Sequence, residues 1–237
     1  MAPPRLLVVT AVAPEAAAVV RGICTALPQV GPVETALPGG WTVQRCGPVD
    51  VLAAGVGPAA AAAGTATALA LDPGGYSLVV SAGIAGGFAP LAPLGCAVVA
   101  EAIIAADLGA DTPDGFATVT ELGFGRVRHD TSHHELVTAR LREAGVPTAT
   151  GPILTVSTVT GSAARATELA ARHPGAVAEA MEGFGVAEAA AGYGTAVLEL
   201  RTVSNAVGPR DRAAWRIGEA FAVLERAFAV LPYGELG

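Results

Sequence analysis

Six short, continuously apolar runs recur along this chain, and they constrain its fold more than any other feature. They occupy residues 5–12, 49–57, 76–87, 95–107, 151–161 and 195–208, are rich in Val, Leu and Ile, and lie close to glycine or proline. A strand that is apolar at every position, and not only at alternate ones, is buried on both faces of its sheet. We therefore expect a central sheet that is covered by helices on both sides.

Segments with a helical pattern lie between these runs, at residues 14–27, 58–71, 132–144, 162–172, 182–192 and about 211–230. Strands that alternate with helices form a mostly parallel sheet with crossover helices. The expected fold class is α/β, with a mixed, mostly parallel central sheet flanked by helices. A length of 237 residues suits a single domain over residues 1–237. Residues 108–131 are the least regular part and the expected active-site loop.

Charge and composition exclude several classes of protein. The formal net charge of −7 leaves no basic face for a nucleic acid or an anionic membrane. All 14 basic residues are arginine, so the chain has neither the lysine of a Walker-type phosphate loop nor one for pyridoxal phosphate. No segment has the roughly 20 apolar residues of a membrane span. Cys24, Cys46 and Cys96 are widely spaced, which favours reduced thiols in a cytoplasmic protein.

Three other motifs each have a structural interpretation beside a functional one. The glycine-rich turns in GVGPAAAAAG and SAGIAGGF allow close approach to a ligand but lack the spacing of a dinucleotide site. The segment RVRHDTSHHE holds His129 and His133 among arginines. The structural interpretation is the solvent-exposed start of a helix. The functional interpretations are a positively charged surface that contacts an anionic group of the substrate or, if a further ligand is present, a metal site. Ser81 lacks the preceding glycine of a nucleophile elbow.

Two carboxylates stand next to the expected strand ends. Glu15 follows the first apolar run, and Glu182 follows Met181 in EAMEGFGVAEAA. Each is also explained as an acid in the first turn of a helix, where it complements the helix dipole. Arg201 and Asn205, the only asparagine of the chain, lie at the end of the last run. Because ligands bind beyond the carboxyl ends of strands in α/β sheets, this set could bind a polyol and a heterocycle.

Five segments together resemble a known family: VVTAVAPE, AAGVGPAAAAAGTA, LVVSAGIAGGF, VAEAMEGFGVAEAA and VLELRTVSN. They occur in the order and approximate spacing of the nucleoside phosphorylase and nucleosidase superfamily. They look most like its purine nucleosidase branch, typified by methylthioadenosine/S-adenosylhomocysteine nucleosidase. The resemblance covers most of the chain and is weak from about residue 105 to 150. It implies a nucleoside phosphorylase-like fold, a small-molecule nucleoside substrate, no cofactor, no metal, and a homo-oligomer that is a dimer or a multiple of dimers.

The resemblance also implies a role for each matching residue at the sugar. Glu182 matches the acid that binds the ribose 2′-hydroxyl and favours the cationic ribosyl centre. Met181 matches the residue packed against the ribose, and Arg201 matches the arginine that pairs with the acid. Glu15 matches the group that deprotonates the attacking water. A carboxylate aimed at developing positive charge is electrostatic catalysis, and a second acid acts as the general base.

Other matching residues are implied to lie around the sugar and the base. Ile84, Ala85 and Gly86 match the backbone that flanks the sugar and the nucleophile. Thr158 and Val159 match the backbone that meets the purine edge, although the base-stacking aromatic residue is absent there. Ser204 and Asn205 match the end of the base-binding strand. Phosphorylases of the superfamily need arginines at the phosphate, whereas SAGIAGGF has none and Glu15 would repel phosphate, so the expected reaction is hydrolysis.

The Ser204-Asn205 pair is a departure from the adenine-cleaving relatives, which have Ser-Asp. An asparagine donates its amide N–H to a 6-oxo group and accepts from N7–H, which suits hypoxanthine, but an amide does not itself deliver a proton to N7. With this asparagine the chain looks like the futalosine hydrolases, which release hypoxanthine from futalosine in the alternative pathway to menaquinone. The alternatives are a methylthioadenosine/S-adenosylhomocysteine or aminofutalosine nucleosidase, a purine nucleoside phosphorylase, and a non-catalytic nucleoside-binding module.

Futalosine carries a benzoate on the 5′ side of its ribose, so the resemblance also implies a cationic partner at that end of the pocket. Arg126, Arg128 and His129 in the irregular middle of the chain are candidates, as is Arg210 after the asparagine strand. We expect one residue of these two groups to meet the carboxylate.

Overall fold

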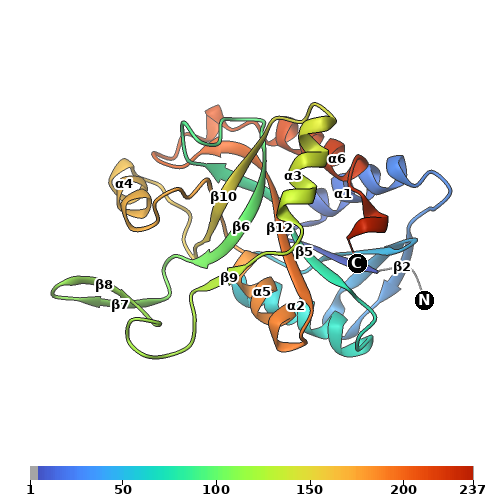
Figure 1. The fold of residues 1–237 in the computed structure, drawn as a ribbon, viewed down its shortest axis with the longest axis horizontal. Coiled ribbons are helices and arrows are strands. Elements are labelled where there is room, and N and C mark those ends of the chain that lie inside the picture. The colour runs from blue at the N-terminus through green and yellow to red at the C-terminus, as the bar shows by residue number, and fades with distance from the viewer. Residues whose placement is uncertain (1–4, 237) are drawn as a thin grey trace.

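A mixed ten-stranded sheet runs through the centre of the molecule in the computed structural model, which describes residues 5–236 (Figure 1). The order is β11-β10-β6-β12-β5-β1-β4-β3-β2, with β9 beside β6, and β7 and β8 form a separate hairpin. The strands are β1 (Leu6–Thr10), β2 (Val33–Ala36), β3 (Thr42–Cys46), β4 (Val49–Ala53), β5 (Leu78–Gly87), β6 (Ala97–Ala105), β7 (Gly109–Thr112), β8 (Gly115–Thr118), β9 (Arg128–Asp130), β10 (Thr148–Thr155), β11 (Ala178–Ala180) and β12 (Ala196–Ala206).

Within residues 5–236, six α-helices accompany the sheet: α1 (Ala13–Ala26), α2 (Pro58–Leu71), α3 (His134–Glu143), α4 (Ala163–Arg172), α5 (Gly183–Gly192) and α6 (Ile217–Ala229). The expected α/β class is confirmed, and each of the six apolar runs overlaps a strand. The long pairings of β12 with β5, β6 with β10 and β1 with β4 are parallel. The last helix begins later than expected, because a separate 3₁₀ turn (Arg212–Ala214) precedes it.

The strands that the apolar pattern did not predict are short or partly exposed. β2 and β3 form the outer edge of the sheet, where β2 has no buried residue. β11 has only three residues, and its sequence AEA has no β-branched side chain. Its pairing is nevertheless important, since β11 bonds to β10 in parallel and to the end of β5 in antiparallel. The strands β5, β12, β6, β10 and β11 are thereby closed into a ring.

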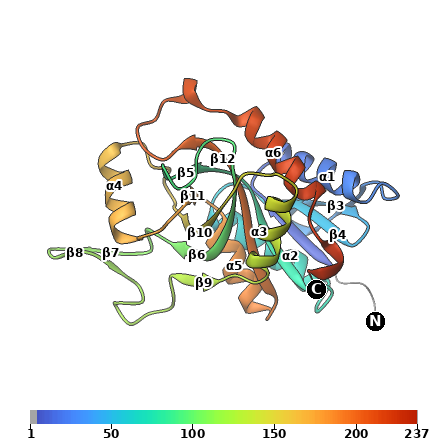
Figure 2. The same cartoon turned by 45° about the horizontal axis from the view of Figure 1, so that its top comes forward.

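Helices cover the two faces of the sheet in two sets (Figures 1 and 2). α2 and α5 pack against each other and contribute Ala61, Leu69 and Phe184 to one hydrophobic cluster. α1, α3 and α6 cover the opposite face, where Leu141 and Phe228 are fully buried. Within residues 5–236, no helix is long and apolar enough to span a membrane. The double covering explains why the central strands are apolar at every position.

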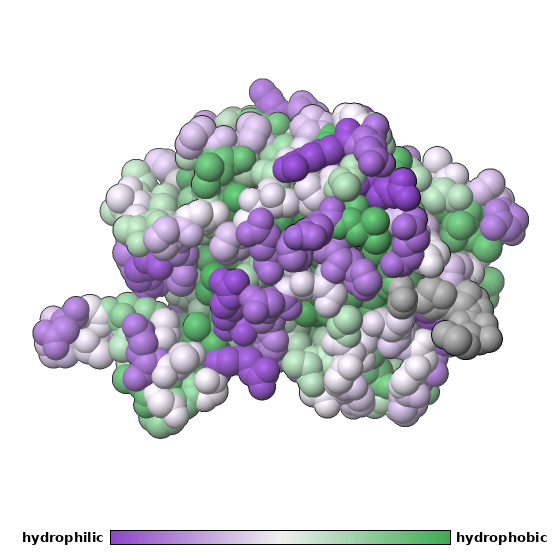
Figure 3. Space-filling view, in the orientation of Figure 1, coloured by the Kyte–Doolittle hydropathy of each residue, from purple (hydrophilic) through white to green (hydrophobic). Residues whose placement is uncertain are grey.

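Residues 108–131 contain the β7–β8 hairpin, which projects from the body of the molecule (Figures 1 and 3). The aromatic ring of Phe116 on this hairpin lies under the guanidinium of Arg172 from α4, at 4.2 Å. Hydrophilic residues gather over β9 and α3 on the face drawn in Figure 3. The segment was expected to form an active-site loop, but none of its residues lines the cavity at the ends of β1, β5 and β12. The reason is that the hairpin extends outward instead of folding back over the strand ends.

The packing of α5 on α2 predicts opposite effects for two glycines of the same helix. A Cβ added at Gly185 would lie 2.0 Å from the carbonyl oxygen of Pro58, whereas one at Gly192 would meet no atom within 4 Å. We expect Gly185→Ala to lower the free energy of unfolding by about 1–3 kcal/mol through overpacking. Gly192→Ala is expected to leave it unchanged or to raise it by about 0.5 kcal/mol. Urea unfolding measures both, and equal effects would contradict the proposed close packing.

Candidate active site

A cavity of about 330 Å³ opens where β1, β5, β11 and β12 end. The residues that line it share this origin in strand ends and in the segments that follow them: Ala11, Val12, Glu15, Val56, Ile84, Ala85, Gly86, Val159, Glu179, Ala180, Met181, Glu182, Ser204, Asn205 and Trp215. β11 reaches this place because it crosses onto the end of β5. The pairing of β11 with β5 thus brings Met181 and Glu182 to the cavity that Glu15 enters from the start of α1.

Glu15 is the third residue of α1 and is held by backbone donors on both of its oxygens. Oε2 accepts from the N–H groups of Ala11 and Val12 at 3.0 and 3.2 Å, and Oε1 accepts from the N–H of Ile84 at 2.9 Å. The side chain is 3% exposed. Burial raises the pKa of Glu15, although the positive charge of Arg201 and the N–H of Ile84 oppose the change. The result is a positioned carboxyl group with enhanced basicity.

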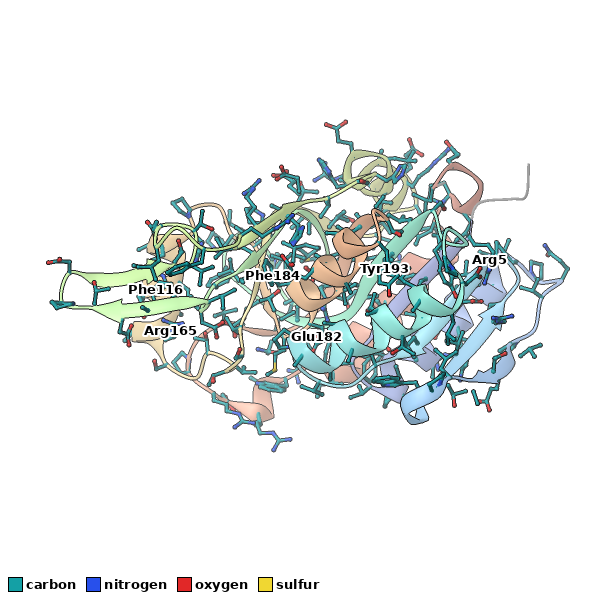
Figure 4. The ribbon with its side chains drawn as sticks, turned by 90° about the horizontal axis from the view of Figure 1, so that it is seen from below. Arg5, Phe116, Arg165, Glu182, Phe184 and Tyr193 are labelled. Carbon is teal, nitrogen blue, oxygen red and sulfur yellow. The ribbon has the colours of Figure 1, made fainter. Side chains whose placement is uncertain are left out.

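Glu182 precedes the first turn of α5, at the point where the N-terminal ends of α5 and α2 come together (Figure 4). Its Oε1 accepts from the backbone N–H of Gly57 at 3.1 Å, and its Oε2 accepts from Nη1 of Arg201 at 3.1 Å. Glu182 is 5% exposed, so its charge is balanced chiefly by the arginine. The carboxylate therefore keeps one fixed orientation at the cavity wall.

Arg201 lies behind the cavity wall and is the largest fully buried side chain. Besides Glu182, it donates from Nε to Glu199 at 2.9 Å and from Nη2 to the Ser81 hydroxyl at 2.9 Å. Burial alone would lower the pKa of Arg201, but Glu199, Glu182 and Glu15 raise it. The guanidinium thus stays charged and links β12, β5 and the start of α5.

Glu199 is a third carboxyl group around this single guanidinium. It is fully buried, burial raises its pKa against the opposing effect of Arg201, and its Oε2 has no hydrogen-bond partner among residues 5–236. A Cβ at Gly183 would lie 2.3 Å from that oxygen, so the glycine at the start of α5 makes room for it. Glu199 thus shares the Arg201 guanidinium with Glu182 from behind the cavity wall.

Ser204 and Asn205 both face the cavity because β12 contains an irregularity at this point. The register with β5 shifts between Val203 and Asn205, so that Val203 pairs with Ala85 and Asn205 with Gly86. Adjacent residues of a regular strand point to opposite faces, and a bulge removes this alternation. The Ser204 hydroxyl donates to Oδ1 of Asn205 at 2.8 Å, and Nδ2 of Asn205 donates to the Ala206 carbonyl at 3.1 Å. The amide keeps one further donor and one further acceptor site.

The structure brings most of the expected site residues together. Nine of them line the cavity: Glu15, Ile84, Ala85, Gly86, Val159, Met181, Glu182, Ser204 and Asn205. Arg201 does not line it but bonds to Glu182 from behind. Thr158 is exposed and lies outside the lining, next to Val159.

Sequence reasoning missed Glu179, Glu199 and Trp215. Glu179 and Glu199 stand on apolar strands, where a carboxylate is unusual, and this is a signal that could have identified them. Trp215 lies outside regular structure, and its position at the cavity depends on the segment after β12. No sequence pattern indicated it.

The side chains of the histidine segment, residues 126–135, do not line the cavity. His129 bonds through Nε2 to Glu188 on α5 at 2.8 Å, and its ring packs beside Phe184. His133 precedes α3 in a left-handed conformation and makes no side-chain cap. Within residues 5–236, no group of three His, Cys, Asp or Glu side chains is arranged to hold a metal.

Comparisons with known proteins agree with this architecture. The model of the phosphorylase superfamily matches residues 5–231. A futalosine hydrolase from Streptomyces coelicolor is 59% identical over 95% of this chain and 94% of its own length. Among solved structures, a mutant of 5′-methylthioadenosine/S-adenosylhomocysteine nucleosidase from Helicobacter pylori with 5′-methylthioadenosine in its active site superposes with a TM-score of 0.80 at 19% identity, covering 96% of both chains. Native futalosine hydrolase from the same organism gives 0.77 at 18% identity, covering 94% of this chain and 95% of its own.

The buried charge cluster predicts a large, pH-dependent effect of removing Arg201. We expect Arg201→Met to lower the free energy of unfolding by about 3–5 kcal/mol at pH 8, because it leaves buried carboxylates unpaired. When the pKa of an acid is higher in the folded than in the unfolded chain, the free energy of unfolding falls as pH rises from the unfolded-state pKa to the folded-state pKa. The loss should therefore be smaller at pH 5. Arg140→Met, at an exposed ion pair, is the control and should change stability by less than about 1 kcal/mol. A pH-independent loss would contradict this prediction.

Proposed function

The chain belongs to the phosphorylase superfamily and, within it, to the futalosine hydrolases, and from this membership we propose how its residues hydrolyse the N-glycosidic bond of futalosine. The products are hypoxanthine and dehypoxanthinyl futalosine, and the reaction belongs to the alternative pathway of menaquinone biosynthesis. The observation that carries the assignment is a cavity lined by the carboxylates of Glu15 and Glu182 and by the amide of Asn205, with no arginine among its lining residues.

In this proposal Glu182 and Glu15 have different roles at the sugar. Cleavage of the bond leaves positive charge on the ribosyl ring, which the fixed carboxylate of Glu182 stabilises while it holds the 2′-hydroxyl. Met181 packs against the ribose. Glu15, with its enhanced basicity, removes a proton from the water that attacks the ring. Ile84, Ala85 and Gly86 form the backbone beside the sugar, and the N–H of Ile84 orients Glu15.

In this proposal Asn205 recognises the base by hydrogen bonds, and Ser204 orients the Asn205 amide. The backbone of Thr158 and Val159 contacts the opposite edge of the purine. The free N–H of Asn205 donates to the 6-oxo group of the base. N7 takes up a proton from solvent as the glycosidic bond breaks, and the oxygen of Asn205 accepts from the resulting N7–H. Phosphate would need a cationic partner at the cavity wall. Arg201 does not supply one, because it does not line the cavity and each of its nitrogens already donates to Glu199, Glu182 or Ser81. The arrangement favours water over phosphate as the nucleophile.

The two groups of basic residues differ in their surroundings. Arg126 and His129 face Glu188, and Arg128 faces Asp130, so all three are engaged with carboxylates. Arg210 belongs to the segment that carries Trp215 to the cavity, and it forms no ion pair within residues 5–236. We propose that Arg210 meets the substrate carboxylate.

Arg210→Ala should raise KM for futalosine about tenfold, because it removes the positive charge that pairs with the carboxylate, and should leave KM for inosine unchanged. Equal effects on both substrates would contradict the assignment.

The finer statements about the whole protein are also proposals. We propose a single domain over residues 1–237, of which residues 1–4 and 237 lie outside the described part, and a location in the cytoplasm, where Cys24, Cys46 and Cys96 would stay reduced. We propose a homo-oligomer that is a dimer or a multiple of dimers, since Val56 and Leu71 beside the two ends of α2 and Tyr193 after α5 are exposed apolar residues. Tyr193 is labelled in Figure 4. Light scattering tests the assembly, and a monomer would contradict it.

The decisive test of the function is release of free base from futalosine, inosine and methylthioadenosine in phosphate-free buffer, followed by chromatography. We expect hypoxanthine from futalosine without added phosphate. A strict phosphate requirement would indicate a phosphorylase. Adenine from methylthioadenosine, with futalosine unchanged, would indicate an adenine-specific nucleosidase. Ligand binding without turnover would indicate a binding module.

Replacing the amide at position 205 should change which base is released. Asn205→Asp loses the donor to the 6-oxo group and gains an acceptor for a 6-amino group. We expect hypoxanthine release from futalosine to fall by about 100-fold or more and adenine release from methylthioadenosine to rise. Asn205→Ala, which should lose both reactions, is the matched variant. If Asn205→Asp still prefers futalosine, the amide does not select the base.

The basicity of Glu15 predicts the acid side of the pH profile. The base must be ionised to accept a proton, and burial raises its pKa, so kcat/KM should increase with pH through an apparent pKa above the ordinary value of 4.5. Glu15→Gln should reduce kcat by about 10²- to 10⁴-fold and remove this ionisation. Glu143→Gln, on the exposed end of α3, should retain the parent profile. Persistence of the same ionisation in Glu15→Gln would show that another group is the base.

A further inference from the structure

Glu179 is a buried carboxyl group in the cavity wall to which the proposed reaction gives no role. It stands in β11, is 5% exposed and lines the cavity. Its Oε1 accepts from the backbone N–H of Thr160 at 2.8 Å, and its Oε2 accepts from the Thr160 hydroxyl. Burial raises the pKa of Glu179, and the two bonds from Thr160 oppose that change. Both oxygens are therefore used to hold a single residue of the loop that follows β10.

That loop, residues 157–161, is fixed at three points. The N–H of Ser157 donates to Asp107 at 2.7 Å, Thr160 is held by Glu179, and the carbonyl of Gly161 accepts from the N–H of Arg210 at 3.3 Å. Between these anchors, the backbone N–H groups of Thr158 and Val159 have no hydrogen-bond partner within residues 5–236. Free peptide groups on a firmly held loop are suited to bind the polar edge of a ligand.

Glu179 also lies in register with the residue that reads the base. It pairs with Gly86 of β5 from one side, and Asn205 pairs with Gly86 from the other side. The carboxylate and the amide thus stand on the two strands that flank Gly86, and both line the cavity. The separation between the loop and Asn205 depends on how the loop is fastened to β11, and Glu179 is the side chain that fastens it.

We propose that Glu179 is a positioning residue for the purine. It holds the loop 157–161 at a fixed separation from Asn205 across Gly86, so that one planar base meets the loop backbone and the Asn205 amide together. This inference rests on the proposed function, because it places the purine between Val159 and Asn205. It separates two tasks: Asn205 selects the 6-substituent, whereas Glu179 sets the affinity for the base.

Substitutions at both ends of the contact isolate its effect. Glu179→Ala removes both bonds to the loop, and Glu179→Gln keeps the shape but turns an N–H toward one of the two Thr160 donors. Thr160→Val removes the hydroxyl and keeps the backbone bond, and Thr160→Ser keeps both. Glu168→Gln removes an exposed carboxylate on α4, just after the loop, and is the matched control.

The measurements are the Kd for hypoxanthine by calorimetry and the pH dependence of kcat and KM for futalosine. We expect Glu179→Ala to raise the Kd and KM by about 10- to 100-fold, the range for hydrogen bonds to a charged group, with a smaller change in kcat. Glu179→Gln and Thr160→Val should lie between it and the parent, and Thr160→Ser and Glu168→Gln should match the parent. The pH profile should keep its shape in every variant.

Several outcomes would overturn the inference. An unchanged Kd for hypoxanthine in folded Glu179→Ala or Glu179→Gln would show that the loop does not depend on the carboxylate. Loss of an ionisation from the pH profile of Glu179→Gln would make Glu179 a proton-transfer group. If Glu179→Ala does not fold, as judged by circular dichroism, the Kd values of Glu179→Gln and Thr160→Val for hypoxanthine test the inference in its place.

The base-binding assay also separates this inference from the proposed function. A parent protein that binds hypoxanthine but does not cleave futalosine contradicts the function and leaves the comparison of Kd values valid. If the parent cleaves futalosine and binds hypoxanthine with the same Kd as Glu179→Ala, the inference alone is contradicted. A parent that does not bind hypoxanthine contradicts the placement of the base itself.

Discussion

The charge of Arg201, enclosed where water cannot reach it, is the constraint on which the rest of the site depends. A buried guanidinium is stable only when every donor has a partner in the right place. Arg201 finds them on three separate elements: Glu199 on its own strand, Ser81 on β5 and Glu182 at the start of α5. These bonds tie the Glu182 carboxylate to β12 and β5, so Glu182 cannot move without taking a partner from the buried guanidinium.

The second constraint is the closure of five strands into a ring. The three residues of β11 have little intrinsic preference for a strand, yet their bonds to β10 and to the end of β5 place three groups at one cavity: Glu179, Met181 and Glu182. On the other side of β5, the irregularity in β12 turns Ser204 and Asn205 toward the same space. A flat, regular sheet would direct one of these two side chains away.

The chemistry of the cavity follows from its unequal charges. Glu15, Glu179 and Glu182 line the cavity, whereas Arg201 is withdrawn behind them, so the wall facing a ligand is acidic. Such a wall favours a positive centre in the substrate and disfavours an anionic nucleophile. Burial, which makes the carboxylates harder to ionise, also makes Glu15 a stronger base. The same desolvation that weakens the fold thus supports the proposed reaction.

The sequence by itself determined the α/β class, the six central strands and the covering helices, because continuous apolar runs and helical periodicity are local properties. It also indicated Glu15, Glu182, Arg201 and Asn205, whose charges or amide stand out at the ends of such runs. Only the tertiary structure decided that Arg201 lies behind the wall, that Glu179 fastens a loop and that Trp215 reaches the cavity. It also decided that residues 108–131 project outward. These features depend on strand closure, on register and on the path of irregular segments. They arise from contacts between residues far apart in the chain, which no local pattern records.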